Sequence, residues 1–282
     1  MTGPKIITSI RELAASYDAL LCDAWGVIHN GVDLFPGADK AMIRFRETRG
    51  PVIILTNAPR PSSIIPAQLD RLGLPRDAYD AVVTSGDATR AAIAARLPSP
   101  AFRLGPPKDD ALYEGLSIDF VPVEEAGFIV CTGLVDDQRD HPEDYRGMLE
   151  RVAERRLPMI CANPDIIVNW GGRKIWCAGA LAEIYEALGG EVIYGGKPHA
   201  PIYDEALKAI SKFRAGVSKE QTLAVGDGLK TDIMGANRQG IDAVLITGAG
   251  GIHDGAGDAA AISLALDQAG VHAVACAEAL KW

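Results

Sequence analysis

Short apolar runs that alternate with helical patterns are the feature that most restricts the fold of this chain. Each run is too short for a helix and is typical of a buried strand. The segments between the runs show amphipathic patterns bounded by glycine, proline and polar residues. Because such alternation produces parallel strands with right-handed crossovers, the sequence predicts an α/β fold. The predicted strands of this sheet cover residues 19–22, 52–55, 81–83, 191–194, 222–225 and 243–246.

The alternation becomes irregular in the middle of the chain. Short apolar runs there are separated by turns and by an acid-rich stretch, and Gly171-Gly172 predicts a hairpin turn. We therefore expect residues 87–179 to form a smaller α+β module inserted into a larger parallel-sheet domain. That larger domain would comprise residues 1–86 and 180–282.

Composition limits the classes of partner. The 282 residues carry a net charge of −9 and contain no basic run, which argues against a nucleic-acid surface. The five cysteines are scattered without a CxxC pair, which suits a reducing cytoplasm and argues against a zinc site or disulfides. No signal peptide is expected, and no run reaches the roughly 18 apolar residues of a membrane span. We expect a cytoplasmic protein with neither a nucleic-acid nor a membrane partner.

Asp23 stands at the end of the apolar run Leu20-Leu21-Cys22, and Gly26 follows within three residues. A carboxylate at the tip of a buried parallel strand lies where open α/β sheets bind ligands. A single aspartate in this place also fits the cap of the next turn. Which interpretation holds depends on the partners that the rest of the chain provides for this carboxylate.

Polar side chains also follow the other predicted strands, and parallel strands bring their carboxyl ends to one edge of the sheet. Carboxylates suit a hard cation such as Mg²⁺, which shares ligands with phosphate, and a carboxylate can attack phosphorus. Hydroxyl, amide and ammonium groups suit phosphate oxygens. Taken singly, Lys197 would also fit a solvated loop, and Thr56 would also fit a helix cap. The convergent residues would be Asp23, Thr56, Asn57, Lys197, Asp227 and Asp232.

The order of these residues resembles the four motifs of the haloacid-dehalogenase-like hydrolases. The long insert between the second and third motifs looks like the capped class IIA phosphatase branch. That branch includes phosphatases of sugar phosphates, phosphoglycolate, p-nitrophenyl phosphate and pyridoxal phosphate. The resemblance covers nearly the whole chain and implies a Rossmann-like core with an inserted cap. The motifs read Asp23, Thr56-Asn57, Lys197-Pro198 and Gly226-Asp227 with Thr231-Asp232.

The resemblance implies a magnesium site and an aspartyl-phosphate intermediate. Asp23 would be both the nucleophile and a Mg²⁺ ligand. Asp227 would be the second carboxylate on the metal, and Asp232 would bind through water or orient the site. The backbone carbonyl of Trp25 would complete the protein ligands, since a backbone ligand does not depend on the side chain.

The resemblance also implies a phosphate-binding group. Thr56 would donate a hydrogen bond to the transferring phosphoryl group, with Asn57 nearby. Lys197 would neutralise charge on the phosphate and on Asp23, so that two anions can approach closely enough to react.

Trp25 departs from the family's first motif, which usually reads Asp-x-Asp-Gly. The second aspartate of that motif protonates the leaving group and then activates water. An indole only donates hydrogen bonds and cannot shuttle protons, and such acid–base help is typically worth about 10²- to 10⁴-fold in rate. His29, His199 or a residue of the cap could replace it, although both histidines also fit surface loop positions.

The inserted module is expected to set specificity, because it can close over the crevice and exclude water. Asn163-Pro164-Asp165 resembles an Asn-x-Asp stretch that faces substrate in class IIA relatives. The same residues fit a proline turn capped by its own Asn and Asp side chains. Caps of this branch often mediate dimerisation, so the resemblance also implies a homo-oligomer formed through the cap.

Three functions are compatible with the sequence. The first is a Mg²⁺-dependent hydrolase of a small phosphorylated metabolite with atypical acid–base catalysis. The second is a C–P bond hydrolase, because branches that cleave C–P or C–halogen bonds also lack the second aspartate. The third is a non-catalytic phosphometabolite-binding or regulatory protein. Asp227 and Asp232 favour metal and phosphoryl chemistry over dehalogenation.

A glycine-rich stretch near the C-terminus follows a predicted strand, as a dinucleotide-binding loop would. His253 occupies the position of the third glycine of that fingerprint, so the fingerprint is incomplete. We therefore expect residues 248–257 to be a loop without a nucleotide-binding role.

Overall fold

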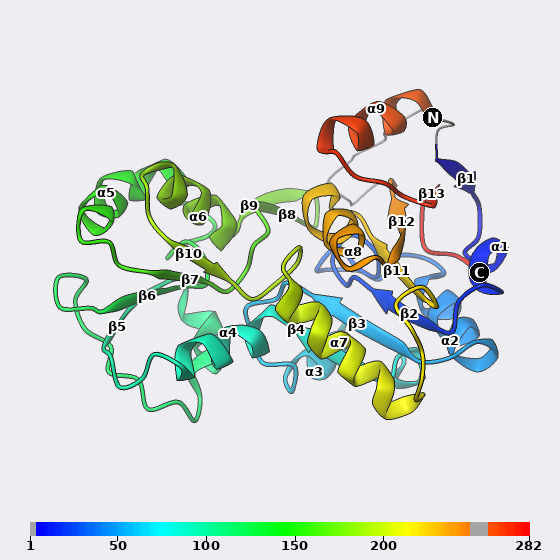
Figure 1. Ribbon diagram of the computed structural model, residues 1–282, viewed down its shortest axis with the longest axis horizontal. Coiled ribbons are helices and arrows are strands. Elements are labelled where there is room, and N and C mark those ends of the chain that lie inside the picture. The colour runs from blue at the N-terminus through cyan, green and yellow to red at the C-terminus, as the bar shows by residue number, and fades with distance from the viewer. Residues whose placement is uncertain (1–3, 249–258) are drawn as a thin grey trace.

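The structure is a computed structural model that describes residues 4–248 and 259–282. The chain forms two lobes, with the larger sheet on the right of Figure 1 and a smaller sheet on the left. Apart from residue 248, the glycine-rich stretch 248–257 lies outside the described residues. None of the described helices combines the length and the apolar character that crossing a membrane would require.

Among the described residues, seven parallel strands form the larger sheet, in the spatial order β1 (Lys5–Ile7), β13 (Ala275–Ala277), β12 (Asp242–Ile246), β11 (Thr222–Gly226), β2 (Ala19–Cys22), β3 (Val52–Thr56) and β4 (Ala81–Thr84). The predicted α/β fold with a parallel sheet is thus confirmed. All residues of β2, β3 and β11 are buried, because both faces of the sheet are covered. The three strands are neighbours, so their carboxyl ends share one edge.

Helices cover the larger sheet on both faces, which gives three layers (Figure 1). Phe45 and Leu69 pack on one face, and Ile202 and Ile262 pack on the other. The first face carries α1 (Arg11–Ala14), α2 (Ala38–Thr48), α3 (Ile65–Arg71) and the 3₁₀ turn η1 (Arg76–Ala78), and the second carries α7 (Ala200–Phe213), α8 (Met234–Gln239) and α9 (Ala259–Ala269).

The smaller sheet is also parallel, in the order β10 (Val192–Tyr194), β7 (Met159–Cys161), β6 (Phe128–Cys131) and β5 (Ala101–Leu104). Two hydrophobic clusters lie on its two faces. One contains α5 (Arg146–Glu154), α6 (Ala178–Ala187) and the adjoining η3 (Pro142–Tyr145), and the other contains α4 (Ser85–Ala94) and η2 (Pro107–Tyr113). The inserted cap is therefore a second parallel-sheet module, and the α+β mixture that the sequence suggested is limited to one hairpin.

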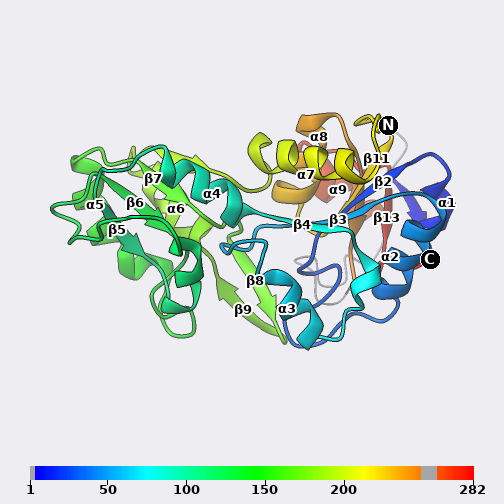
Figure 2. The same ribbon diagram turned by 90° about the horizontal axis from the view of Figure 1, so that it is seen from below.

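That hairpin consists of β8 (Ile167–Trp170) and β9 (Arg173–Trp176), which pair antiparallel. Its turn is Gly171-Gly172, as predicted, and both glycines have the positive φ angles that two-residue hairpin turns require. Figure 2 shows the hairpin between the two lobes, beside α3 of the larger domain.

The division at residue 179 needs a correction. That border assigned α6 and β10 to the larger domain, but Leu181 and Tyr185 of α6 pack in the core of the cap. Strand β10 pairs with β7 of the smaller sheet, so the cap continues to residue 194. Periodicity identifies a helix followed by a strand, but it carries no information about which sheet receives the strand.

The core of the larger domain generates a stability prediction. Phe45 of α2 is fully buried, whereas Phe213 at the end of α7 is 53% exposed. We expect Phe45→Ala to lower the free energy of unfolding by about 3–5 kcal/mol in urea titrations, because the change leaves a cavity. Phe213→Ala is the matched control and should change it by less than about 0.5 kcal/mol. Equal effects of the two changes would contradict the assigned core.

Candidate active site

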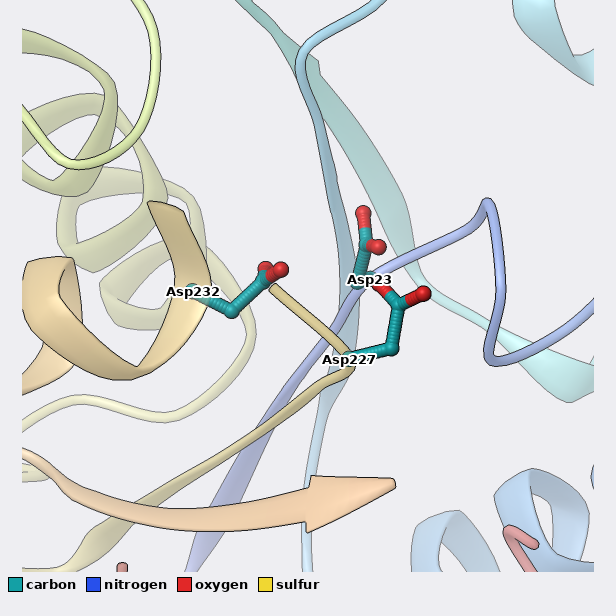
Figure 3. A group of neighbouring side chains, drawn as sticks. All are labelled: Asp23, Asp227 and Asp232. Atoms are coloured by element: carbon teal, nitrogen blue, oxygen red, sulfur yellow. The ribbon is translucent and has the colours of Figure 1, made fainter. Parts of the chain in front are cut away.

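Three carboxylates meet at the carboxyl ends of β2 and β11 (Figure 3). Asp23 follows β2, and its backbone N–H donates to the carbonyl of Val225 in β11 at 2.9 Å. Asp227 follows β11, and Asp232 lies in the following turn, η4 (Leu229–Ile233). One oxygen from each carboxylate lies within 4.8 Å of the others, and all three residues are buried.

Glycines make this close approach feasible. Gly26 has φ +81°, and a Cβ added there would lie 2.1 Å from Oδ2 of Asp227. A Cβ on Gly226 would lie 2.2 Å from the side chain of Asp232. Any larger residue at either position would displace a carboxylate, which explains why glycines occupy positions 26 and 226.

Lys197 joins two of the three carboxylates. Its Nζ donates to Oδ1 of Asp23 and to Oδ1 of Asp232, each at 2.6 Å, and the lysine is buried. Burial lowers the pKa of Lys197, but the charges of Asp23 and Asp232 outweigh it and hold the pKa well above its usual value. The side chain is therefore an ammonium. Burial, with the neighbouring charge of Asp232, raises the pKa of Asp23 well above its usual range.

The donor set of this cluster fits a hard divalent cation. Three carboxylates supply the oxygen ligands that Mg²⁺ prefers. The backbone hydrogen bonds of the adjacent turn run from Gly26 N to His29 O and from Ile28 N and His29 N to Ala24 O. None of them uses the carbonyl oxygen of Trp25, so this oxygen stays available for the predicted role of metal ligand.

Thr56 and Asn57 lie at the end of β3, beside Asp23. The Thr56 hydroxyl accepts a weak hydrogen bond from Ala58 N at 3.3 Å, which leaves its proton free for a phosphate oxygen. The Asn57 side chain accepts from Lys197 N at 2.8 Å and donates to Lys197 O at 3.2 Å and to Asp165 Oδ1 at 2.9 Å. Because these bonds occupy the Asn57 amide, any contact of Asn57 with phosphate would have to come from its backbone.

Trp25 contacts the hairpin of the cap. Its Nε1 donates to the carbonyl of Asn169 in β8 at 2.8 Å, and its ring lies edge-on to His29 with the centroids 5.1 Å apart. Gly31 leaves room for the ring, since an added Cβ would lie 2.6 Å from it. Trp25 therefore connects the core with the cap, and its only proton donor is already bonded.

The two histidines suggested as substitutes for the missing acid have other environments. His29 is buried, and its Nδ1 accepts a hydrogen bond from Gly31 N at 3.0 Å. Burial lowers its pKa to about 4, so the ring is neutral near pH 7. His199 is half-buried at the start of α7 and stacks on Tyr194 of β10, with the ring centroids 4.6 Å apart.

The cap loop Asn163-Pro164-Asp165 reaches the same site. Asn163 Oδ1 accepts from Asp165 N at 3.0 Å, which is the self-capped proline turn that one interpretation of the sequence described. The carboxylate of Asp165 is left to bind Asn57 of the core. Burial raises the pKa of Asp165. Both Asn163 and Asp165 line a cavity of about 520 Å³ between core and cap.

Several residues that line this cavity belong to none of the sequence motifs. Arg60 of the core bonds Asp109 of the cap at 2.9 Å, and Lys108 forms an ion pair with Asp137. Trp170 and Trp176 of the hairpin also line the cavity. The pairs join residues far apart in the sequence, so only the fold brings them together. The one sequence feature that could have indicated them is the insert, which contains all of these residues except Arg60.

Comparisons with known proteins identify the family of this chain. Residues 20–117 match the family "Haloacid dehalogenase-like hydrolase", and residues 194–268 match the related "HAD-hyrolase-like" family. The crystal structure of a hydrolase of the haloacid dehalogenase-like family from Brucella suis is 45% identical, with a TM-score of 0.88. The similarity covers 98% of this chain and 100% of that one. The chain therefore belongs to the haloacid dehalogenase-like hydrolases, as its motifs predicted.

More distant structures share the fold. A "possible sugar phosphatase" from Cytophaga hutchinsonii is 24% identical with a TM-score of 0.79, and 98% of each chain is covered. A p-nitrophenyl phosphatase from Archaeoglobus fulgidus is 21% identical with a TM-score of 0.70, over 93% of this chain and 96% of that one. No match was found among curated proteins.

The buried His29 generates a pH prediction. Between its ordinary pKa of 6.5 and about 4, the unfolded chain binds a proton at this position that the folded chain does not. The free energy of unfolding should therefore fall as the pH falls through this window, by up to about 3 kcal/mol, and should be fully retained above it. Urea titrations from pH 7 to pH 4 test this. His29→Gln should show a shallower decline, and an equal decline in both proteins would contradict the assignment.

Proposed function

We propose that this protein is a Mg²⁺-dependent phosphatase that acts on a small phosphorylated metabolite through an aspartyl-phosphate on Asp23. The contact of Lys197 with both Asp23 and Asp232 is the observation that carries this proposal. A buried ammonium bonded to a carboxylate prepares that carboxylate to meet a second anion, the phosphate ester. The hydrolase family of the chain and the position of Asp23 after β2, beside the end of β11, support the same conclusion.

Each residue would contribute one part of the chemistry. The Asp23 carboxylate would attack phosphorus, while the ammonium of Lys197 offsets the charge of the two anions. The free hydroxyl proton of Thr56 would bind a phosphate oxygen. Asp23, Asp227, Asp232 and the Trp25 carbonyl would hold Mg²⁺, which supplies positive charge to the phosphate oxygens when bound.

The cavity between core and cap indicates the size and character of the substrate. At about 520 Å³ it accommodates a small molecule. The charges of Arg60 and Lys108 are already matched by acids of the cap. Arg71 also lines the cavity, so a substrate with one phosphate and at most one further anionic group fits this lining. Two proteins with this fold are described as phosphatases, one of them of p-nitrophenyl phosphate.

A second candidate function is a non-catalytic phosphometabolite-binding protein. The observation that favours it is Trp25, which stands where the family's proton donor usually does and whose indole N–H is bonded to Asn169. A phosphorylated ligand would then bind to the same lysine and threonine without turnover. Two further expectations stay predictions, namely association through the cap and a cytoplasmic location.

Magnesium binding provides one test. Mg²⁺ at a hundred times its dissociation constant should stabilise the folded protein by about 2.7 kcal/mol, seen as a rise in Tm that EDTA reverses. Asp227→Asn should remove most of this rise, because a carboxylate of the cluster loses its charge. Asp267→Asn, at an exposed position of α9, is the control and should retain the whole rise. A full rise in the Asp227 variant would contradict the proposed metal site.

Phosphate release provides the test of the reaction. With Mg²⁺, the protein should hydrolyse members of a panel of phosphate monoesters, and Asp23→Asn should lower the rate at least about 10³-fold by removing the nucleophile. Asp204→Asn, at an exposed position of α7, is the matched control and should keep the rate. Stabilisation by phosphate esters without any phosphate release would instead support the binding protein.

A further inference from the structure

A phosphatase of this kind needs a proton at the leaving oxygen, and the usual position cannot supply it. Trp25 has only an N–H, which is bonded to Asn169 O. His29 also lines the cavity, but its Nδ1 accepts a hydrogen bond from Gly31 N, so the ring is neutral and carries only the weakly acidic Nε2–H. His199 stacks on Tyr194 and does not line the cavity. The proton donor must therefore come from another group beside the cavity.

Among the described residues, three carboxyl groups line this cavity. Asp109 is bonded to the Arg60 guanidinium at 2.9 Å, and Asp137 is paired with the Lys108 ammonium. Both carboxyl groups are therefore already bonded to a cation, while burial raises the pKa of Asp109. Asp165 is the third, and it has no cation within ion-pair distance among the described side chains.

Asp165 is also connected to the reacting centre, through Asn57 and Lys197. The Asp165 Oδ1 accepts a hydrogen bond from Asn57 Nδ2 at 2.9 Å. The Asn57 side chain also accepts from Lys197 N and donates to Lys197 O. Lys197 in turn contacts the Asp23 carboxylate at 2.6 Å. No hydrogen bond to Oδ2 of Asp165 is found among the described residues, so this oxygen is free to carry a proton.

Burial favours the protonated form of this side chain. Desolvation raises the pKa of Asp165, in spite of the opposing effects of Lys197 and the Asn57 hydrogen bond. Acid–base catalysts work best when their pKa approaches the pH at which they operate. The environment of Asp165 shifts it in that direction.

We propose that Asp165 of the cap is the general acid and base of the reaction, in the role that an aspartate at position 25 would otherwise have. The inference rests on the proposed phosphatase function. As the Asp23 oxygen bonds to phosphorus, the bond from phosphorus to the leaving oxygen breaks, and that oxygen takes its electron pair and the proton of Asp165. The Asp165 carboxylate then accepts a proton from water as the water oxygen attacks phosphorus. The bond from phosphorus to Asp23 breaks with its electrons returning to the carboxylate, and inorganic phosphate leaves.

This assignment differs from a purely structural role in one measurable respect. A general acid matters for an alkyl phosphate, whose alkoxide leaves poorly without a proton, and matters little for p-nitrophenyl phosphate. A residue that only holds the loop or the substrate would affect both esters equally. The ratio of the two kcat/KM values therefore isolates proton transfer, because kcat/KM reports the steps up to departure of the alcohol.

The test compares Asp165→Asn with the wild-type protein in the presence of Mg²⁺. Asparagine keeps an acceptor for Asn57 but carries no transferable proton. We expect kcat/KM to fall about 10²- to 10⁴-fold for an alkyl phosphate and less than about tenfold for p-nitrophenyl phosphate. The variant should also release p-nitrophenolate in a burst stoichiometric with the enzyme, because water attack on the aspartyl-phosphate becomes slow.

Two further variants complete the design. Asp137→Asn makes the same change in a paired carboxylate of the same cavity and should leave the ratio of the two kcat/KM values unaltered. Asp165→Glu retains a carboxyl group that can transfer a proton. Its ratio of the two kcat/KM values should therefore be closer to that of the wild-type protein than to that of the Asp165→Asn variant. Equal losses for both esters in the Asp165→Asn variant, or no loss for either, would overturn the role of Asp165 and leave the phosphatase in place. Failure of the wild-type protein to hydrolyse any ester would overturn both.

Discussion

A buried ammonium held between two carboxylates is the interaction on which the rest of this active centre depends. Lys197, Asp23 and Asp232 come from three separate segments and lose nearly all their contact with water. Removing charges from water is costly unless each finds a partner at short range, so the three segments must be fixed together. With Asp227 included, the cluster has more carboxylates than ammonium groups, and a divalent cation would balance that excess.

The parallel sheet is what brings these charges together. Asp23 and Asp227 follow the neighbouring strands β2 and β11, and Thr56 ends β3 on the other side of β2. The cap then covers this edge with the hairpin and with Asn163-Pro164-Asp165. In the proposed reaction the core would supply the nucleophile and the phosphate-binding groups, and the cap would supply the walls around the leaving group.

Much of the core and the positions of its motifs could be predicted from the sequence, because a buried parallel strand followed by a polar residue leaves a local pattern. Asp23, Thr56 and Asp227 could be placed at one edge for that reason. The end of the cap, the bond from Trp25 to Asn169 and the pairing of Arg60 with cap acids could not. They depend on contacts between residues far apart in the chain, which periodicity does not report. The hydrogen bonds that occupy the Asn57 amide are also contacts between residues far apart in the chain, so the sequence did not predict them.

The course of the chain out of the cap has a mechanical consequence. Strand β10 ends at Tyr194, and Lys197 follows after only Gly195-Gly196. Gly196 is packed so closely that an added Cβ would lie 2.5 Å from Oδ1 of Asn57. A rotation of the cap would therefore act on the segment that carries Lys197 and on the Asn57 amide that bonds its backbone. Any opening of the cleft would in this way also disturb the contact between Lys197 and Asp23.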